Sequence, residues 1–139
     1  MHDQHIHGSC LCGQITYQYS GPVKVFQYCH CSRCRKFTGT AHASNIIVDP
    51  RQFEWIRGEE FLGRYEVPEA RHFATSFCQR CGSALPWLTQ SGKAVVIPAG
   101  TLDEDPNIKP QHNIFYASRA PWYVEVDSLT KYDELPVKK

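Results

Sequence analysis

Seven cysteines in three tight clusters constrain this chain more than any other feature of its sequence. The clusters are Cys10 and Cys12, then Cys29, Cys31 and Cys34, then Cys78 and Cys81. An odd number of cysteines cannot all pair within one chain, and tight clustering in a reducing compartment is typical of metal sites. The pattern therefore predicts bound metal rather than a disulfide framework.

Length and charge narrow the class of protein further. A chain of 139 residues with 42% hydrophobic residues predicts one domain over 1–139, with flexible tails at 1–7 and 136–139. Lysine and arginine number 15 against 14 acidic residues, without a block of like charges, which argues against a nucleic-acid partner. The first residues lack a leader pattern, and no apolar run nears the roughly 18 residues of a membrane span. We expect a cytoplasmic protein that does not bind membranes.

Short runs of β-branched and aromatic residues recur between glycines, prolines and asparagines. No segment keeps the 3.6-residue apolar period of a helix over ten or more residues, so the pattern predicts a mostly β protein with antiparallel sheets. The expected strands are 14–20, 23–29, 43–48, 61–67, 71–77, 93–99 and 113–118. Single helical turns are expected at 31–39, stopped by Gly39, and near 128–135, and a long surface loop is expected at 98–110.

The first and last cysteine pairs share a glycine directly after the second cysteine, at Gly13 and Gly82. Glycine reaches the positive-φ conformations that point backbone N–H groups at thiolate sulfurs in zinc sites. Together the two pairs, Cys10 with Cys12 and Cys78 with Cys81, predict one structural zinc site. Its binding free energy would exceed the entropy of closing a loop of about seventy residues.

Two other interpretations of the Cys78 and Cys81 pair stay open. It could be a redox pair, or these could be small buried apolar residues. A redox pair should begin a helix within a βαβ unit, whereas residues 71–88 have the pattern of strand, turn and strand.

The remaining cysteines, Cys29, Cys31 and Cys34, are three in number. Zinc held by three protein ligands keeps a position for water or substrate. Three thiolates around Zn²⁺ give a net charge of −1, which makes the ion a weak activator of water but still a good binder of thiols, whose pKa is about 8.5. We therefore predict a catalytic site at these three cysteines, suited to making or breaking a bond to sulfur.

Cations follow this cluster closely. Arg33, Arg35 and Lys36 could offset its negative charge, and Arg33 and Lys36 are candidate substrate-binding residues for carboxylates. A solvated basic turn is the alternative interpretation.

Three alternatives for the cluster itself also stay open. A fourth ligand from His30, His42 or His112 would close the site and make it structural. Without metal, the cysteines could instead form an exposed redox sensor. The N-terminal segment HDQHIH could bind a metal by itself, or it could be a floppy tail.

Five segments, in order along the chain, resemble the glutathione-dependent formaldehyde-activating enzymes, also called the Gfa/CENP-V family. They are GSCLCGQITY (8–17), YCHCSRCRKFTG (28–39), FCQRCGSAL (77–85), AGTLDEDP (99–106) and IFYASRAPWY (114–123). The resemblance implies an Mss4-like, mostly β fold and two zinc ions per chain. One would be structural, at Cys10, Cys12, Cys78 and Cys81, and the other more labile and catalytic, at Cys29, Cys31 and Cys34.

The resemblance also implies an activity, a carbon–sulfur lyase that condenses glutathione with formaldehyde to S-hydroxymethylglutathione. The expected partners are a glutathione-like thiol and a small carbonyl compound. The alternative is a zinc-binding module without turnover, acting as a thiol or metal sensor. One position departs from the family, because many relatives carry histidine directly before the IF pair, where this chain has Asn113, with His112 one residue earlier.

Overall fold

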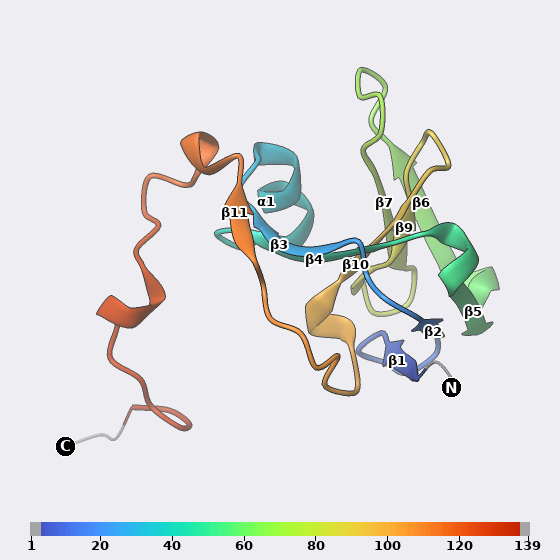
Figure 1. The fold of residues 1–139 in the computed structure, drawn as a ribbon, viewed down its shortest axis with the longest axis horizontal. Helices are drawn as coiled ribbons and strands as arrows, with labels where there is room; N and C mark the ends of the chain where they lie inside the picture. The colour runs from blue at the N-terminus through green and yellow to red at the C-terminus, as the bar shows by residue number, and fades with distance from the viewer. Residues whose placement is uncertain (1–3, 137–139) are drawn as a thin grey trace.

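The computed structural model describes residues 4–136, which form eleven strands and one α-helix (Figure 1). The strands are β1 (His5–Ser9), β2 (Thr16–Ser20), β3 (Val25–Cys29), β4 (Ala43–Val48), β5 (Phe53–Arg57), β6 (Leu62–Glu66), β7 (Ala74–Cys78), β8 (Ala84–Leu85), β9 (Trp87–Leu88), β10 (Val95–Pro98) and β11 (His112–Ile114). The helix is α1 (Ser32–Thr38). Short 3₁₀ turns occur at Pro50–Gln52, Glu59–Phe61, Ala99–Thr101, Tyr116–Ser118 and Val126–Ser128.

The strands build three sheets, in the orders β1-β2-β5, β11-β3-β4-β10-β9 and β6-β7-β8. Every strand pair is antiparallel except β11 with β3, which is parallel. The prediction of a mostly β fold with antiparallel sheets is therefore confirmed. The parallel pair is possible because a long connection, not a hairpin, returns the chain to the edge of the sheet.

The main core lies between these sheets and is built from alternating residues of the strands. Ile15, Tyr17, Ile46 and Ile97 are completely buried. Strand β2 alternates half-buried and buried residues along its length, as expected for a strand with one face on the core. The hydroxyl of Tyr17 lies 2.6 Å from that of Thr101, so its polar end is satisfied inside the core.

Helix α1 agrees with the helical turn predicted at 31–39. Cys31 is its N-cap, and Gly39 ends it in the left-handed conformation, with φ of 66° and an N–H bond to the Arg35 carbonyl. The second predicted turn, near 128–135, is wrong, since only the 3₁₀ turn Val126–Ser128 lies beside it. Residues 129–135 are exposed, and a short helix without packing is not stable in water.

The N-terminal tail is shorter than the sequence predicted. His5–Ser9 forms strand β1, paired with β2, and Ile6 is buried in the core. Burial of this one apolar side chain and the backbone pairing account for the difference. Residues 1–3 and 137–139 of the predicted tails lie outside the described residues.

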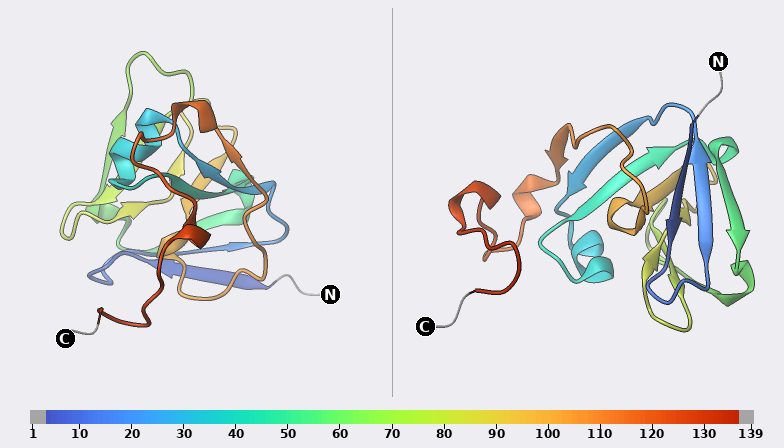
Figure 2. Two further views of the ribbon diagram at one scale, coloured as in Figure 1. Left: turned by 90° about the vertical axis from the view of Figure 1, so that its left-hand side faces the viewer. Right: turned by 90° about the horizontal axis from the view of Figure 1, so that it is seen from below.

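A C-terminal arm, residues 119–136, runs away from the sheets (Figure 2). Its start is fixed by the buried residue Ala120. Beyond that point it exposes the large apolar side chains of Trp122, Val124, Val126, Leu129, Tyr132 and Leu135.

None of the helices within residues 4–136 is both long enough and apolar enough to cross a lipid bilayer.

Candidate functional site

The four cysteines of the first and last pairs meet at one point. Cys10 and Cys12 lie in the turn after β1, Cys78 ends β7, and Cys81 lies in the turn before β8. All four Sγ atoms lie within 4.8 Å of one another, with 3.7 Å between Cys10 and Cys12 and 3.9 Å between Cys12 and Cys78. Tetrahedral zinc with Zn–S bonds of about 2.3 Å places sulfurs about 3.8 Å apart. The group fits a zinc ion, and these separations are far longer than the roughly 2.05 Å of a disulfide.

Backbone N–H groups point at these sulfurs, as expected of a zinc site. The Ile15 N–H lies 3.3 Å from the Sγ of Cys10, and the N–H groups of Arg80 and Cys81 each lie 3.4 Å from the Sγ of Cys78. Although burial acts to raise it, hydrogen bonds from Ser83 contribute to lowering the pKa of Cys81 to about 5. A thiol that ionises readily is a ready metal ligand.

The two glycines predicted to permit these turns do so. Gly13 and Gly82 both have φ of 78°, and their N–H groups bond the carbonyls of Cys10 and Cys78 at 3.0 and 2.8 Å. Strand β7 continues through this turn into the antiparallel strand β8. This is the strand, turn and strand arrangement, not the helix start that a redox pair would need.

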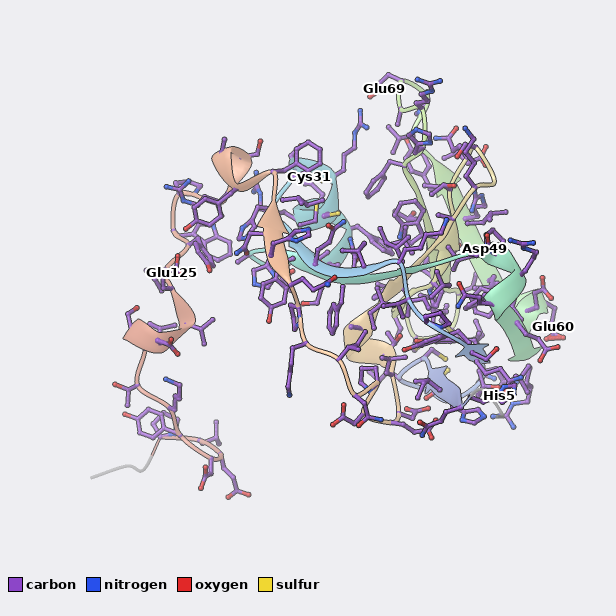
Figure 3. The ribbon with its side chains drawn as sticks, viewed as in Figure 1. His5, Cys31, Asp49, Glu60, Glu69 and Glu125 are labelled. Atoms are coloured by element: carbon purple, nitrogen blue, oxygen red, sulfur yellow. The ribbon has the colours of Figure 1, made fainter. Side chains whose placement is uncertain are left out.

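The other three cysteines form a second group. Cys29 ends β3, Cys31 caps α1, and Cys34 lies in the first turn of α1, so the start of the helix brings them together. Their Sγ atoms lie within 4.8 Å of one another, and the N–H of Cys34 bonds the Sγ of Cys31 at 3.3 Å. Figure 3 shows Cys31 at the start of α1, with sulfur atoms beside it. Cys29 and Cys34 are buried, and Cys31 is partly exposed.

The close sulfurs of the second group shift one another's pKa values. Hydrogen bonds from the thiols of Cys29 and Cys34 lower the pKa of Cys31 far below its usual range. The same contacts, with burial, raise the pKa of Cys34, and the contact with Cys31 raises that of Cys29. Three close thiols can thus release one proton easily and the others only with difficulty. A divalent cation would replace those protons, so the donor set fits zinc.

None of the three candidate histidines joins this group as a fourth ligand. Among residues 4–136, no His, Asp or Glu ligand atom completes the set within 4.8 Å of the three sulfurs. The Nε2 of His30 instead lies 2.9 Å from the Oδ1 of Asn113, and the Nε2 of His112 lies 2.9 Å from the Oε1 of Gln27. The described residues therefore offer three ligands here, not four.

Of the two N-terminal histidines that the structure describes, His7 is engaged elsewhere. His5 and His7 lie in β1, and the Nδ1 of His7 lies 2.6 Å from the Oε1 of Glu104. Within residues 4–136, neither His5 nor His7 belongs to a group of side chains that could hold a metal ion.

An aromatic cluster that the sequence did not predict surrounds His30. This side chain is completely buried, and its ring lies about 5 Å from those of His42, Tyr116 and Tyr123. The Nδ1 atoms of His30 and His42 have no hydrogen-bond partner among the described residues. The only sequence signal was indirect, the segment IFYASRAPWY, which supplies both tyrosines.

A groove of about 500 Å³ lies between α1 and the sheet of β6 and β7. The helix and this sheet lie side by side in Figure 2. Arg33 and Lys36 both line the groove, and neither forms an ion pair with a described residue. Phe73 lines the groove and also packs against the group of Cys29 and Cys34. The groove therefore adjoins the three-cysteine group. Its remaining lining residues are Ser32, Phe37, Tyr65, Val67, Thr75, Phe77 and Gly82.

The mostly β fold and the two separate groups of cysteines define this chain as a small β protein with two candidate metal sites. Comparison with protein families shows which family it belongs to. The model of the family described as "Glutathione-dependent formaldehyde-activating enzyme" matches residues 5–118. The chain belongs to this family.

A relative agrees with this assignment, and a solved structure shares the fold. A protein of Halomonas elongata, named provisionally as a glutathione-dependent formaldehyde-activating enzyme, is 30% identical over 133 residues, which covers 88% of this chain and 82% of the relative. A crystal structure of a Rhodobacter sphaeroides protein matches with a TM-score of 0.58 and 21% identity, covering 77% of this chain and 97% of that one. The solved structure supports the fold alone.

Proposed function

We propose that this chain is a zinc-dependent carbon–sulfur lyase that adds a thiol such as glutathione to a small aldehyde, or cleaves the adduct. One observation carries the proposal. The three sulfurs of Cys29, Cys31 and Cys34 converge without a fourth described ligand, next to a groove that holds two unpaired cations. The family description, which names glutathione and formaldehyde, supports the same chemistry.

The reaction forms one bond and moves one proton. The sulfur of the thiol attacks the carbonyl carbon, the C–S bond forms, and the carbonyl oxygen becomes a hydroxyl by taking up the proton that the thiol releases. A zinc ion on the three cysteines would supply a position that favours the thiolate form of the substrate. Neither direction changes an oxidation state, so no redox partner is needed.

The chain's own residues would bind and orient the thiol. Arg33 and Lys36 offer charge-assisted hydrogen bonds to the carboxylates of a glutathione-like substrate. Phe73, which contacts both the groove and the cysteine group, would keep water from one side of the reacting sulfur. Seven thiols without disulfides fit a reducing, cytoplasmic setting.

The alternative is a thiol or metal sensor without turnover, and one observation favours it. The described lining of the groove contains no imidazole and no carboxylate, which are the commonest general acids and bases. In a sensor, a thiol would bind the second zinc and release it.

The test uses the full chain purified gently with zinc. We expect about two zinc ions per chain by mass spectrometry, with one lost when millimolar glutathione or a mild chelator is added. We also expect the zinc-loaded protein to accelerate exchange between free formaldehyde and its glutathione adduct, measured by NMR line broadening or saturation transfer. Loss of one zinc without any acceleration would establish the sensor. A single tightly held ion under all conditions would contradict both.

A further inference from the structure

The groove beside the three-cysteine group has an apolar wall that a one-carbon aldehyde does not require. The aromatic rings of Phe37, Tyr65, Phe73 and Phe77, with Val67, line it. Its volume of about 500 Å³ lies within the range of sites that enclose whole small molecules. Formaldehyde has no side chain to place against such a surface.

Most of the apolar wall comes from β6, β7 and the segment before β7, with Phe37 added from α1, whereas both cations come from α1. Tyr65 lies on β6 and Phe77 on β7, across the groove from Arg33 and Lys36. Apart from Phe37, the apolar residues therefore reach the groove from other elements than the cations do. An occupant that satisfies both carries a carboxylate at one side and an apolar group at the other.

Phe73 links the groove to the three-cysteine group. It lines the groove and also packs against the buried cluster of Cys29, Cys34 and Ala43, so the aromatic wall continues toward the site where a sulfur would bind. The ring of Phe73 is itself held by Trp87, 4.9 Å away between centroids. The Phe73 part of the wall is thus packed into the fold.

We propose that this groove selects thiol conjugates that are anionic and carry an apolar, preferably aromatic, substituent on sulfur. This inference rests on the proposed function and names its substrate class. The aldehyde would be larger than formaldehyde, of the form R′CHO with an apolar R′. The reaction is RSH + R′CHO ⇌ RS–CH(OH)R′, in which the C–S bond forms and the thiol proton ends on the new hydroxyl.

Stable conjugates test this binding without any turnover. S-methyl-, S-hexyl- and S-benzylglutathione share the same carboxylates and differ only in the group on sulfur. Titration calorimetry with the zinc-loaded full chain should show S-benzylglutathione binding at least tenfold more tightly than S-methylglutathione, with S-hexylglutathione between them. Equal affinities for all three conjugates would overturn the inference.

Matched variants locate the effect. Tyr65→Ala removes one half-exposed ring of the wall, and Tyr132→Ala removes a ring of equal exposure on the C-terminal arm, 56% and 55% exposed respectively. Tyr65→Ala should lose at least threefold of the preference for S-benzylglutathione while its affinity for S-methylglutathione stays the same. Tyr132→Ala should change neither. A loss of the preference in Tyr132→Ala but not in Tyr65→Ala would contradict this location.

Two combinations of experimental results distinguish a failure of this inference from a failure of the proposed function. If the enzyme turns over the formaldehyde adduct but shows no preference for S-benzylglutathione, the inference fails and the function stands. If S-benzylglutathione binds tightly and prefers the intact wall, but no aldehyde adduct is formed or cleaved, the function fails and the groove remains a binding site for apolar thiol conjugates.

Discussion

The Nε2 of His30 lies 2.9 Å from the Oδ1 of Asn113, and this contact ties β11 to the loop between β3 and α1. With Asn113 as acceptor, the proton of His30 is on Nε2, and the buried Nδ1 is left as an acceptor without a described partner. Asn113 is the position where the resemblance to the family led us to expect a histidine. In this chain it orients the buried ring between the two segments that flank the three-cysteine group.

Asn113 can be tested by two substitutions. Asn113→Leu should lower the free energy of unfolding by about 1 kcal/mol, because the buried N–H of His30 loses its acceptor. Asn113→His keeps a ring nitrogen that can accept this bond and should lose less. Urea denaturation at fixed zinc measures both, and an equal loss in the two variants would show that the hydrogen bond is not the cause.

The two cysteine groups should differ in what they support. Cys81→Ala should remove a zinc ion and unfold the chain at room temperature, since the four-cysteine group joins β1 to the β7–β8 turn. Cys34→Ala should keep the circular dichroism spectrum, retain one zinc and lose turnover. Zinc content and thermal melts measure the difference. A folded Cys81→Ala with full zinc would refute the structural role of that group.

Arg33 and Lys36 should act on binding and not on chemistry. Neutralising them in Arg33→Gln and Lys36→Gln should raise KM for glutathione about fivefold each, with kcat little changed, because each loses an exposed charge-assisted contact. The effect should shrink at high salt, since exposed charges are screened. Lys93→Gln, an exposed lysine in the turn before β10, is the control and should leave KM unchanged. A fall in kcat alone would assign these cations another role.

Gly13 should be required for its conformation and not for space. A Cβ at Gly13 would meet no atom within 4 Å, but φ of 78° is strained for any residue with a side chain. Gly13→Ala should therefore cost about 1 kcal/mol of unfolding free energy. Gly100, which also has open space and lacks positive φ, provides the control, because Gly100→Ala should be close to neutral. Similar losses at both positions would contradict the argument.

The end of the C-terminal arm should contribute little to the fold. A chain ending at Ser128 should unfold within about 0.5 kcal/mol of the whole chain, because residues 129–136, the described part of the removed segment, are exposed. A chain ending at Ser118 also loses the buried residue Ala120 and the ring of Tyr123 that packs on His30, and should be clearly less stable. Chemical denaturation of the two truncated chains compares them. Equal stability of both would show that the arm does not anchor on the body.

Much of the fold could be predicted from the sequence because most strands and the end of the helix depend on neighbouring residues. Strands β2, β3, β4, β6, β7, β10 and β11 fall within or largely overlap predicted runs, and α1 ends at the predicted glycine. Strand β1 was missed because its sequence, HIHGS, is polar apart from one isoleucine. Strand β5, FEWIR, was also missed, although Pro50 and Gly58 bound it. Both strands owe their conformation to pairing with β2.

What the sequence determined by itself is the grouping of neighbours: the spacing of Cys29, Cys31 and Cys34 along a strand end and helix start, and the glycines that turn the chain after Cys12 and Cys81. What only the tertiary structure decided is which distant segments meet, namely β1 with the β7–β8 turn, Asn113 with His30, and the aromatic residues of β6 and β7 with the cations of α1. Short-range spacing restricts only the backbone of adjacent residues. Contacts between segments far apart depend on how whole sheets pack, and no local pattern records that.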